Sequence, residues 1–177
     1  MSLPRSLAAA LLVPTLVAAP LASAQSPAPS NPLDTVPEKM PFDVPYGAPI
    51  SLDRAKALVD AAVAESKKRD WKMNVAVVDS GGNLVTFQRM DGAQLASISI
   101  SEHKARASVK YRRETKAFEN AIQLSNFHYI ATLDDVIASR GGIPLVEGGK
   151  LIGAIGCSGG TGSQDEVICK AAAAMVK

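Results

Sequence analysis

The spacing of apolar residues predicts a helix at each end of the folded region. Between residues 51 and 69 apolar side chains recur every three or four positions, which is the period of one helix face. Ser51 precedes this segment as a cap, and a basic cluster closes it. We expect the last helix to begin at Ser163, three residues before Glu166 in the spacing of a capping box, and to run towards Lys177.

Short apolar runs separated by turn-forming residues predict two β-hairpins. The first pairs residues 73–78 with 84–89, and the second pairs 143–146 with 151–155. Tight turns join antiparallel strands, so a parallel sheet is not expected. Residues 136–139 are a further candidate strand. The fold class expected is therefore α/β of the α+β type, with a central antiparallel sheet of about five strands and helices packed on it.

Two helices are expected between the hairpins, one over residues 95–113 and a shorter one after Thr115. The longer helix has one face of small residues and one basic face. The small face consists of Ser97, Ser101, Ala105 and Ser108, and the basic face of His103, Arg106, Lys110 and Arg113. The basic face is either a solvated surface or a cationic rim for the carboxylates of a ligand.

Residues 1–24 have the pattern of a signal peptide. Arg5 precedes an apolar run over residues 7–19, and Ala22-Ser23-Ala24 forms an A-x-A cleavage site. The run contains Pro14 and is too short for a spanning helix. We therefore expect a periplasmic or secreted protein, cleaved near Ala24 and without stable membrane insertion.

Residues 25–49 hold seven of the eleven prolines, and this composition predicts an extended arm. Residues 50–177 are then the folded domain. The formal net charge of the whole chain is only +2, whereas nucleic-acid binding depends on a strong basic excess. Nucleic acid is therefore not an expected partner.

The two cysteines, Cys157 and Cys169, have three possible roles. They are small apolar core residues, a disulfide favoured by an oxidising compartment, or part of a metal site that lacks a nearby histidine. The sequence spacing alone leaves open whether their Cα atoms approach within about 7 Å, the limit for a disulfide.

A glycine-rich loop over residues 156–162 lies between the last predicted strand and the last helix. Backbone N–H groups at a helix start can hold an anion, so Gly159 and Gly160 either line a ligand pocket or form a tight turn. The loop fits G-x-S-x-G, but no histidine follows Ser158 as a serine hydrolase of that type requires. It also lacks the parallel βαβ setting of a dinucleotide site.

Several segments together resemble one family. These are GGIPL, GKLIGAIGCSGG and SQDEVICKAA, with AVVDSGGNL, RMDGA and a helix carrying Lys104-Ala105 upstream. They are similar to the GlcG/HbpS-like family of haem-binding and haem-degrading proteins, which also occurs as the C-terminal domain of PduO-type proteins. The resemblance covers roughly residues 50–177 and implies a profilin-like, PduO C-terminal-like fold, a homo-oligomer and a haem or related anionic ligand.

Any haem would be bound non-covalently, because the chain has no C-x-x-C-H attachment motif. The possible iron ligands are His103, Tyr111, His128, Met90 and Thr115. His103 is the preferred one, since Arg106 and Arg113 on the same face could pair with the propionates. Thr115, Gly159 and Gly160 complete the expected cofactor-binding residues.

Two other function classes remain open from the sequence. One is an enzyme acting on a small organic acid or carbonyl compound, with Arg89, Asp79 or Asp165 as catalytic groups. The simpler interpretations are turn formation for Asp79 and Asp91, and a helix N-terminal acid for Asp165. The other class is a structural or sensory partner protein. The sequence arguments for a homo-oligomer are the small-residue face of residues 97–108 and the low-charge segment 171–174 of the last helix. The alternative is that both surfaces pack onto the sheet of the same chain.

The signal-peptide interpretation predicts the N-terminus of the mature protein. Protein purified from the extracytoplasmic fraction of its native host should begin at or near Gln25, which intact mass spectrometry will show. A full-length chain that still carries Met1 in that fraction would contradict the prediction.

Overall fold

A computed structural model gives the fold of the chain and describes residues 31–177. Lys39–Lys177 form one compact unit, and the short 3-10 turn Pro32–Asp34 lies outside it. The predicted signal peptide falls outside the described residues. No helix between residues 31 and 177 combines the length and apolar character needed to cross a bilayer.

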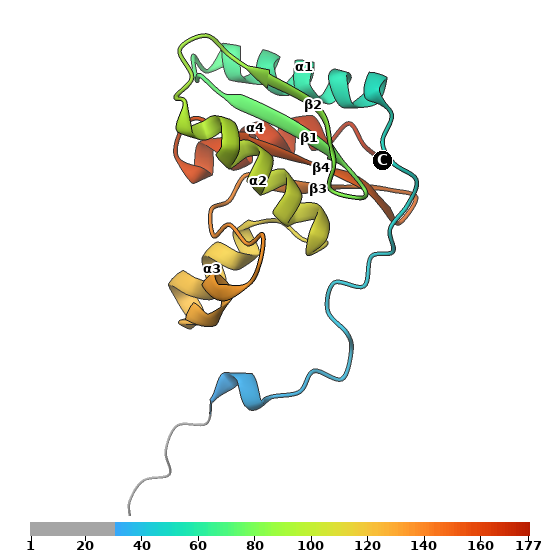
Figure 1. Ribbon diagram of the computed structural model, residues 1–177, viewed down its shortest axis with the longest axis vertical. Coiled ribbons are helices and arrows are strands. Elements are labelled where there is room, and N and C mark those ends of the chain that lie inside the picture. Colours follow the sequence, from blue (N-terminus) through green and yellow to red (C-terminus); the bar gives the residue numbers. More distant parts are fainter. Residues whose placement is uncertain (1–30) are drawn as a thin grey trace, which may run out of the picture. The chain divides into compact units, whose positions relative to one another are not determined.

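The centre of the domain is a four-stranded antiparallel sheet (Figure 1). Its strands are β1 (Asn74–Asp79), β2 (Leu84–Arg89), β3 (Gly142–Glu147) and β4 (Lys150–Ser158), in the spatial order β2-β1-β4-β3. Both predicted hairpins are confirmed, and they join through pairing of β1 with β4. Gly156 and Cys157, expected in a loop, belong to β4.

The expectation of about five strands is wrong, because residues 136–139 form no strand. They follow the 3-10 helix η2 (His128–Thr132) in an irregular segment. Val136 and Ile137 pack against a small cluster around Phe118 and Ile130 instead of extending the sheet. A short apolar run between turn residues is equally typical of a strand and of a loop that packs against a core, so the sequence alone does not distinguish the two.

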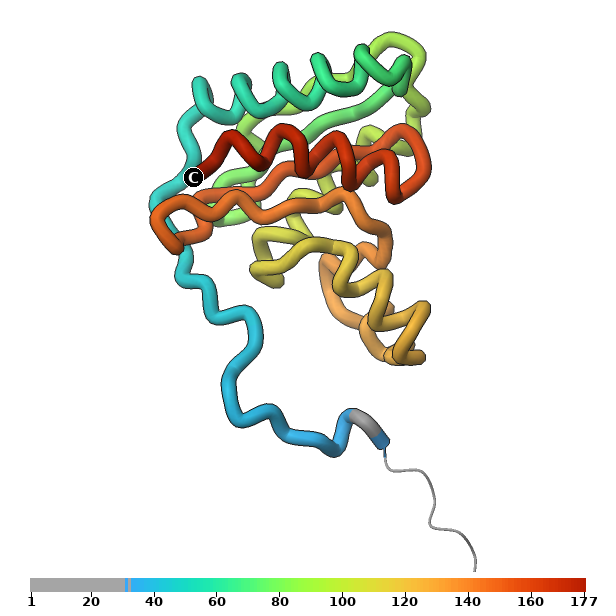
Figure 2. Tube along the Cα trace, turned by 180° about the vertical axis from the view of Figure 1, so that it is seen from behind, coloured from blue at the N-terminus to red at the C-terminus, as the bar shows by residue number. Residues whose placement is uncertain are grey.

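Helices cover both faces of the sheet. α1 (Leu52–Lys68) and α4 (Gly162–Ala173) lie side by side on one face, as Figure 2 shows, and α2 (Ala96–Lys110) lies on the other. α3 (Lys116–Ser125) continues from α2 and packs with η2. The larger apolar core lies between the sheet and the α1–α4 layer, and a smaller one lies beneath α2.

The helix starts follow from capping side chains. The Ser51 hydroxyl accepts a hydrogen bond from the Arg54 N–H, which confirms the predicted cap of α1. For α4 the predicted start at Ser163 is wrong. Thr161 is the cap and forms a capping box with Gln164, whose side chain accepts from the Thr161 N–H at 2.8 Å. The pairs Thr161/Gln164 and Ser163/Glu166 both have the spacing of a capping box, and the helix begins at the earlier pair.

The small-residue face of α2 is buried against the sheet of the same chain. A Cβ atom added at Gly156 would lie 2.0 Å from the Ser101 carbonyl oxygen, and one added at Gly142 would lie 2.3 Å from that of Lys104. The helix and strand backbones therefore touch with no room for side chains. The proposed use of this face in subunit contacts is wrong, whereas the homo-oligomer itself stays a prediction.

The last part of the expected proline-rich arm lies against the domain. Tyr46 forms a parallel bridge with Leu151, and the Gly47 N–H donates to the Leu151 carbonyl at 2.8 Å. The Tyr46 hydroxyl also donates to the carbonyl of Lys110, where α2 ends. These contacts connect the arm to both β4 and α2.

Cys157 and Cys169 form a disulfide, which decides among the three roles left open by the sequence. The bond joins β4 to α4, with Cα atoms 5.7 Å apart, and both residues are fully buried. Their separation of 12 residues closes a short loop that contains the glycine turn and the start of α4.

Replacing both cysteines by alanine is expected to lower the free energy of unfolding by about 2–4 kcal/mol, because the unfolded chain regains the entropy of the open loop. Urea denaturation will measure the change. Dithiothreitol should destabilise the natural chain and leave the double alanine variant unaffected. If dithiothreitol has no effect on the natural chain, the disulfide is not stabilising the fold.

Candidate functional site

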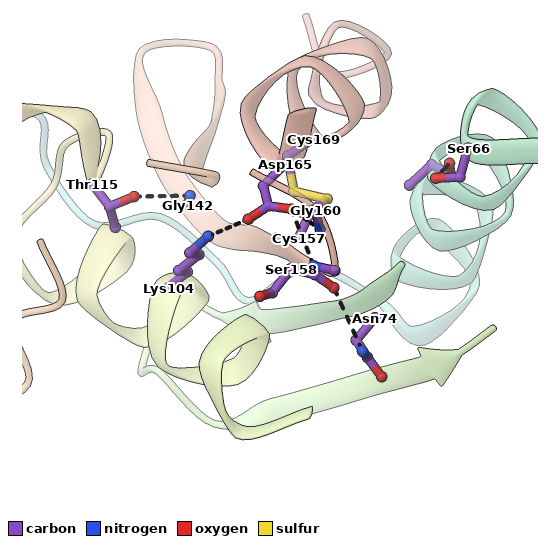
Figure 3. The surroundings of a disulfide bond; sticks show 12 residues. Ser66, Asn74, Lys104, Thr115, Gly142, Cys157, Ser158, Gly160, Asp165 and Cys169 are labelled. Atoms are coloured by element: carbon purple, nitrogen blue, oxygen red, sulfur yellow. Dashed lines mark hydrogen bonds and ion pairs between the residues drawn. A yellow bond between two sulfur atoms is a disulfide. The ribbon is translucent and has the colours of Figure 1, made fainter. Parts of the chain in front are cut away.

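A buried ion pair connects α2 with α4. Lys104 Nζ lies 2.7 Å from Asp165 Oδ2, and the two side chains are only 1% and 3% exposed. The other carboxylate oxygen accepts hydrogen bonds from the N–H groups of Gly159 and Gly160, both at 3.1 Å (Figure 3). The Asp165 carboxylate thus has three donors, as a buried charge requires.

The ion pair runs past the start of β3, where Gly141 leaves space for it. A Cβ atom at Gly141 would lie 2.8 Å from the Asp165 Cβ and 3.2 Å from Lys104 Nζ. Gly141 also has a φ of +117°, which L side chains rarely adopt. Next to it, the buried Thr115 hydroxyl accepts from the Gly142 N–H at 3.0 Å. Thr115 is therefore occupied in holding β3 to the start of α3.

Asp165 is enclosed, so it has no route to a substrate in this structure. Burial raises the pKa of Asp165, while the Lys104 ammonium and the two glycine N–H groups act in the opposite direction. The sequence predicted that the N–H groups of Gly159 and Gly160 could bind an anionic ligand. In the structure they donate to the carboxylate of Asp165 instead. The simpler interpretation of Asp165 as an acid at the N-terminus of α4 agrees with this geometry.

Asp79 forms the turn between β1 and β2. Its Oδ1 accepts from the N–H groups of Gly81 at 2.8 Å and Asn83 at 2.9 Å. Burial opposes ionisation, but these hydrogen bonds hold the pKa of Asp79 below its usual value. In the β1–β2 register Arg89 lies opposite Asn74, at the far end of the hairpin from the turn that Asp79 forms. Asp79 and Arg89 therefore do not share a site. Arg89 and Asp91 are exposed and line a surface groove.

The outer face of α2 carries the basic residues that the sequence proposed for cofactor binding. His103 and Arg106 are both half-buried there. Arg106 pairs with Glu102 at 3.2 Å, and Lys110 pairs with Asp135. His103 Nε2 is shielded from solvent and has no hydrogen-bond partner. A buried nitrogen without a partner is uncommon and costs free energy, so this atom is the most unusual polar group on the face.

Arg113 follows the end of α2, and the proline-rich arm covers it. The guanidinium carbon lies 3.3 Å from the centre of the Phe42 ring, and Nε donates to the Tyr111 carbonyl at 3.0 Å. Among residues 31–177 no carboxylate pairs with Arg113. Burial lowers the pKa of this guanidinium. It is a partly desolvated cation at the edge of the face that holds His103.

The remaining iron-ligand candidates are placed elsewhere or are engaged. Met90 is buried in the core on the α1 side of the sheet, and His128 is exposed at the start of η2. The Tyr111 hydroxyl donates to the Asp134 carbonyl at 2.6 Å. Only His103 combines a free nitrogen with nearby cations from the predicted set. Phe42, in the apolar part of the proline-rich arm, is expected from the sequence to lie across the domain or a neighbouring subunit, but no local pattern identifies Arg113 as its partner.

A comparison with known protein families shows which family the chain belongs to. A family model described as "Haem degrading protein HbpS-like" matches residues 50–174, which is more than half of the chain. This chain belongs to the HbpS-like family. The family that the sequence motifs indicated is thereby confirmed, together with its fold.

Individual HbpS-like relatives agree with this assignment. Protein GlcG from Escherichia coli (strain K12) is 38% identical over 109 residues, covering 62% of this chain and 81% of GlcG. A crystal structure of HbpS has a TM-score of 0.69 at 26% identity and covers 78% of this chain and 98% of its own. A structure of a PduOC:heme complex has a TM-score of 0.67 at 27% identity, covering 73% and 96%.

Changing Asp165 to Asn is expected to lower the free energy of unfolding by about 3–5 kcal/mol, because Lys104 is then a buried cation without a counter-charge. Urea denaturation at neutral pH will measure this loss. Glu147→Gln is the control, since it removes an ion pair with Arg54 whose side chains are both 43% exposed. That exposed pair should contribute less than about 1 kcal/mol. Equal losses in the two variants would contradict a special role for the buried pair.

Proposed function

We propose that this HbpS-like protein binds haem, or a related anionic ligand of similar shape, non-covalently on the outer face of α2. The observation that carries the proposal is His103 Nε2, which is shielded from water and has no hydrogen-bond partner. An imidazole nitrogen is a common axial ligand of haem iron. A rotation of the half-buried His103 side chain that brings Nε2 to the surface would let iron satisfy this atom.

The charges around His103 suit the propionates of haem. Arg106 is half-buried on the same face, and Arg113 at its edge has no carboxylate partner among the described residues. Arginine forms two parallel hydrogen bonds with a carboxylate. Arg106 would hold one propionate in exchange for its contact with Glu102, and Arg113 would hold the other once Phe42 moves off it. When bound, haem supplies redox and ligand-binding chemistry at its iron, and the chain's residues would orient it and set its polarity.

The family and one solved relative support this proposal. The matching family model describes haem-degrading proteins, and PduOC was crystallised with haem. The buried disulfide supports the further proposal that the protein is exported, because disulfides persist in oxidising compartments. Self-association is also part of the proposal, and the exposed side chains of Leu124, Tyr129 and Leu133 near α3 offer apolar surface for it.

Titration with haemin is expected to produce a Soret band in the natural chain, and His103→Ala should lose that band or shift it strongly. His128→Ala is the matched control, because His128 is exposed and lies off this face. Circular dichroism of each variant will establish that the fold is retained. A Soret band unchanged by His103→Ala and lost in His128→Ala would overturn the assignment of the ligand.

Arg106→Gln tests the propionate contact separately. Loss of a charge-assisted hydrogen bond should weaken haemin binding by roughly 10- to 100-fold without moving the Soret maximum, since the iron ligand is untouched. Absence of any haemin binding by the natural chain would reject the proposed function as a whole.

A further inference from the structure

A groove on the α1 side of the sheet is unrelated to the His103 face. It has a volume of about 380 Å³ and lies between the end of α1, the start of β1 and the end of β2. This volume falls within the range of small-molecule sites, roughly 300–1,000 Å³. The residues that line it are Val63, Lys67, Lys72, Gln88, Arg89, Met90 and Asp91.

The groove exists because neither layer covers this end of the domain. β2 is an edge strand, so nothing in the sheet lies beyond it. α1 ends at Lys68, and the chain then reverses at Asp70, whose φ is +53°. This reversal brings Lys72 beside the end of β2, opposite the last turn of α1.

The charge of the groove is positive. Three cations line it against the single carboxylate of Asp91. Lys72 is paired with Asp70, whereas Lys67 and Arg89 form no ion pair within the part of the chain that the structure describes. Two cations in one concave surface therefore have no ion-pair partner among the described residues. The groove stays net positive despite the Asp91 carboxylate, and a concave surface of one sign concentrates ions of the other.

The floor of the groove is apolar. Val63 and Met90 are both at least nine-tenths buried and belong to the main core, so their exposed atoms face the groove from below. A ligand that fits must combine negative groups for Lys67 and Arg89 with an aliphatic body over these two side chains. Inorganic phosphate has no such body, so it would leave these two apolar side chains uncovered.

We propose that this groove is a binding site for a small aliphatic dicarboxylate. One carboxylate pairs with the guanidinium of Arg89, which can hold it with two hydrogen bonds, and the other pairs with Lys67. Gln88 contributes a neutral hydrogen-bonding group at the same end of β2. The site lies on the opposite face of the sheet from α2, so it is independent of haem binding.

Titration with succinate tests the site, and the fluorescence of Trp71 reports on it. Trp71 is the only tryptophan of the chain and lines a second groove that shares Lys72 with the first. Succinate should bind saturably, and its neutral analogue succinamide should not. Arg89→Gln should weaken succinate binding by roughly 10-fold or more, because it removes a charge-assisted contact. Arg89 is exposed and unpaired, so the fold should be unaffected.

Lys68→Gln is the matched control. Lys68 is the neighbour of Lys67 on α1, pairs with Glu65 and does not line the groove, yet its substitution changes the net charge equally. Succinate affinity should be unchanged in Lys68→Gln and reduced in Lys67→Gln. Equal losses in both lysine variants, tighter binding of inorganic phosphate than of succinate, or no saturable binding would overturn the proposal. Haemin binding should be unaltered in all these variants, which separates this test from that of the His103 face.

Discussion

The interaction on which this domain depends is the buried ion pair between Lys104 and Asp165. It joins helices from opposite faces of the sheet at the point where β3 begins. Taking two charges out of water costs several kcal/mol for each ion, and the cost is recovered only when every polar atom finds a partner. The N–H groups of Gly159 and Gly160 supply the missing partners for the carboxylate. The glycine turn, the cap of α4 and the orientation of α2 are therefore fixed together.

This constraint also determines which residues α2 presents outward. Successive helix residues are about 100° apart, so an inward Lys104 places Arg106 on the opposite side of the helix. The backbone contact of Ser101 with Gly156 fixes the same orientation from the sheet. The basic face is thus held outward, and His103 is left at its border with a shielded nitrogen. The packing of Lys104 and Ser101 against the rest of the domain therefore determines which residues of α2 form the candidate haem face.

The sequence predicts the larger elements well, because each has a local signal. Alternating apolar runs around glycine turns predict both hairpins, and Ser51 correctly marks the start of α1. Local signals fail where two of them compete, as at the overlapping capping boxes of Thr161 and Ser163. They also fail for Val136 and Ile137, since a buried loop and a strand have similar composition.

The candidate site is less predictable, because its geometry depends on contacts between distant residues. A lysine in a helix is normally expected at the surface, so the burial of Lys104 has no local signal. The small residues of α2 indicate close packing, but only the structure shows that the partner is the chain's own Gly156. The disulfide was one of three open alternatives, and a Cα separation of 5.7 Å could not be derived from the spacing of the cysteines.

A double-mutant cycle on the ion pair tests this account most directly. Lys104→Met and Asp165→Asn would be combined, since the Asn carbonyl can still accept from the glycine N–H groups while both charges are removed. The account predicts that the double variant is more stable than the sum of the two single losses implies, with a coupling of roughly 0.5–3 kcal/mol in urea denaturation. Strictly additive losses would contradict it, because the two residues would then stabilise the fold independently.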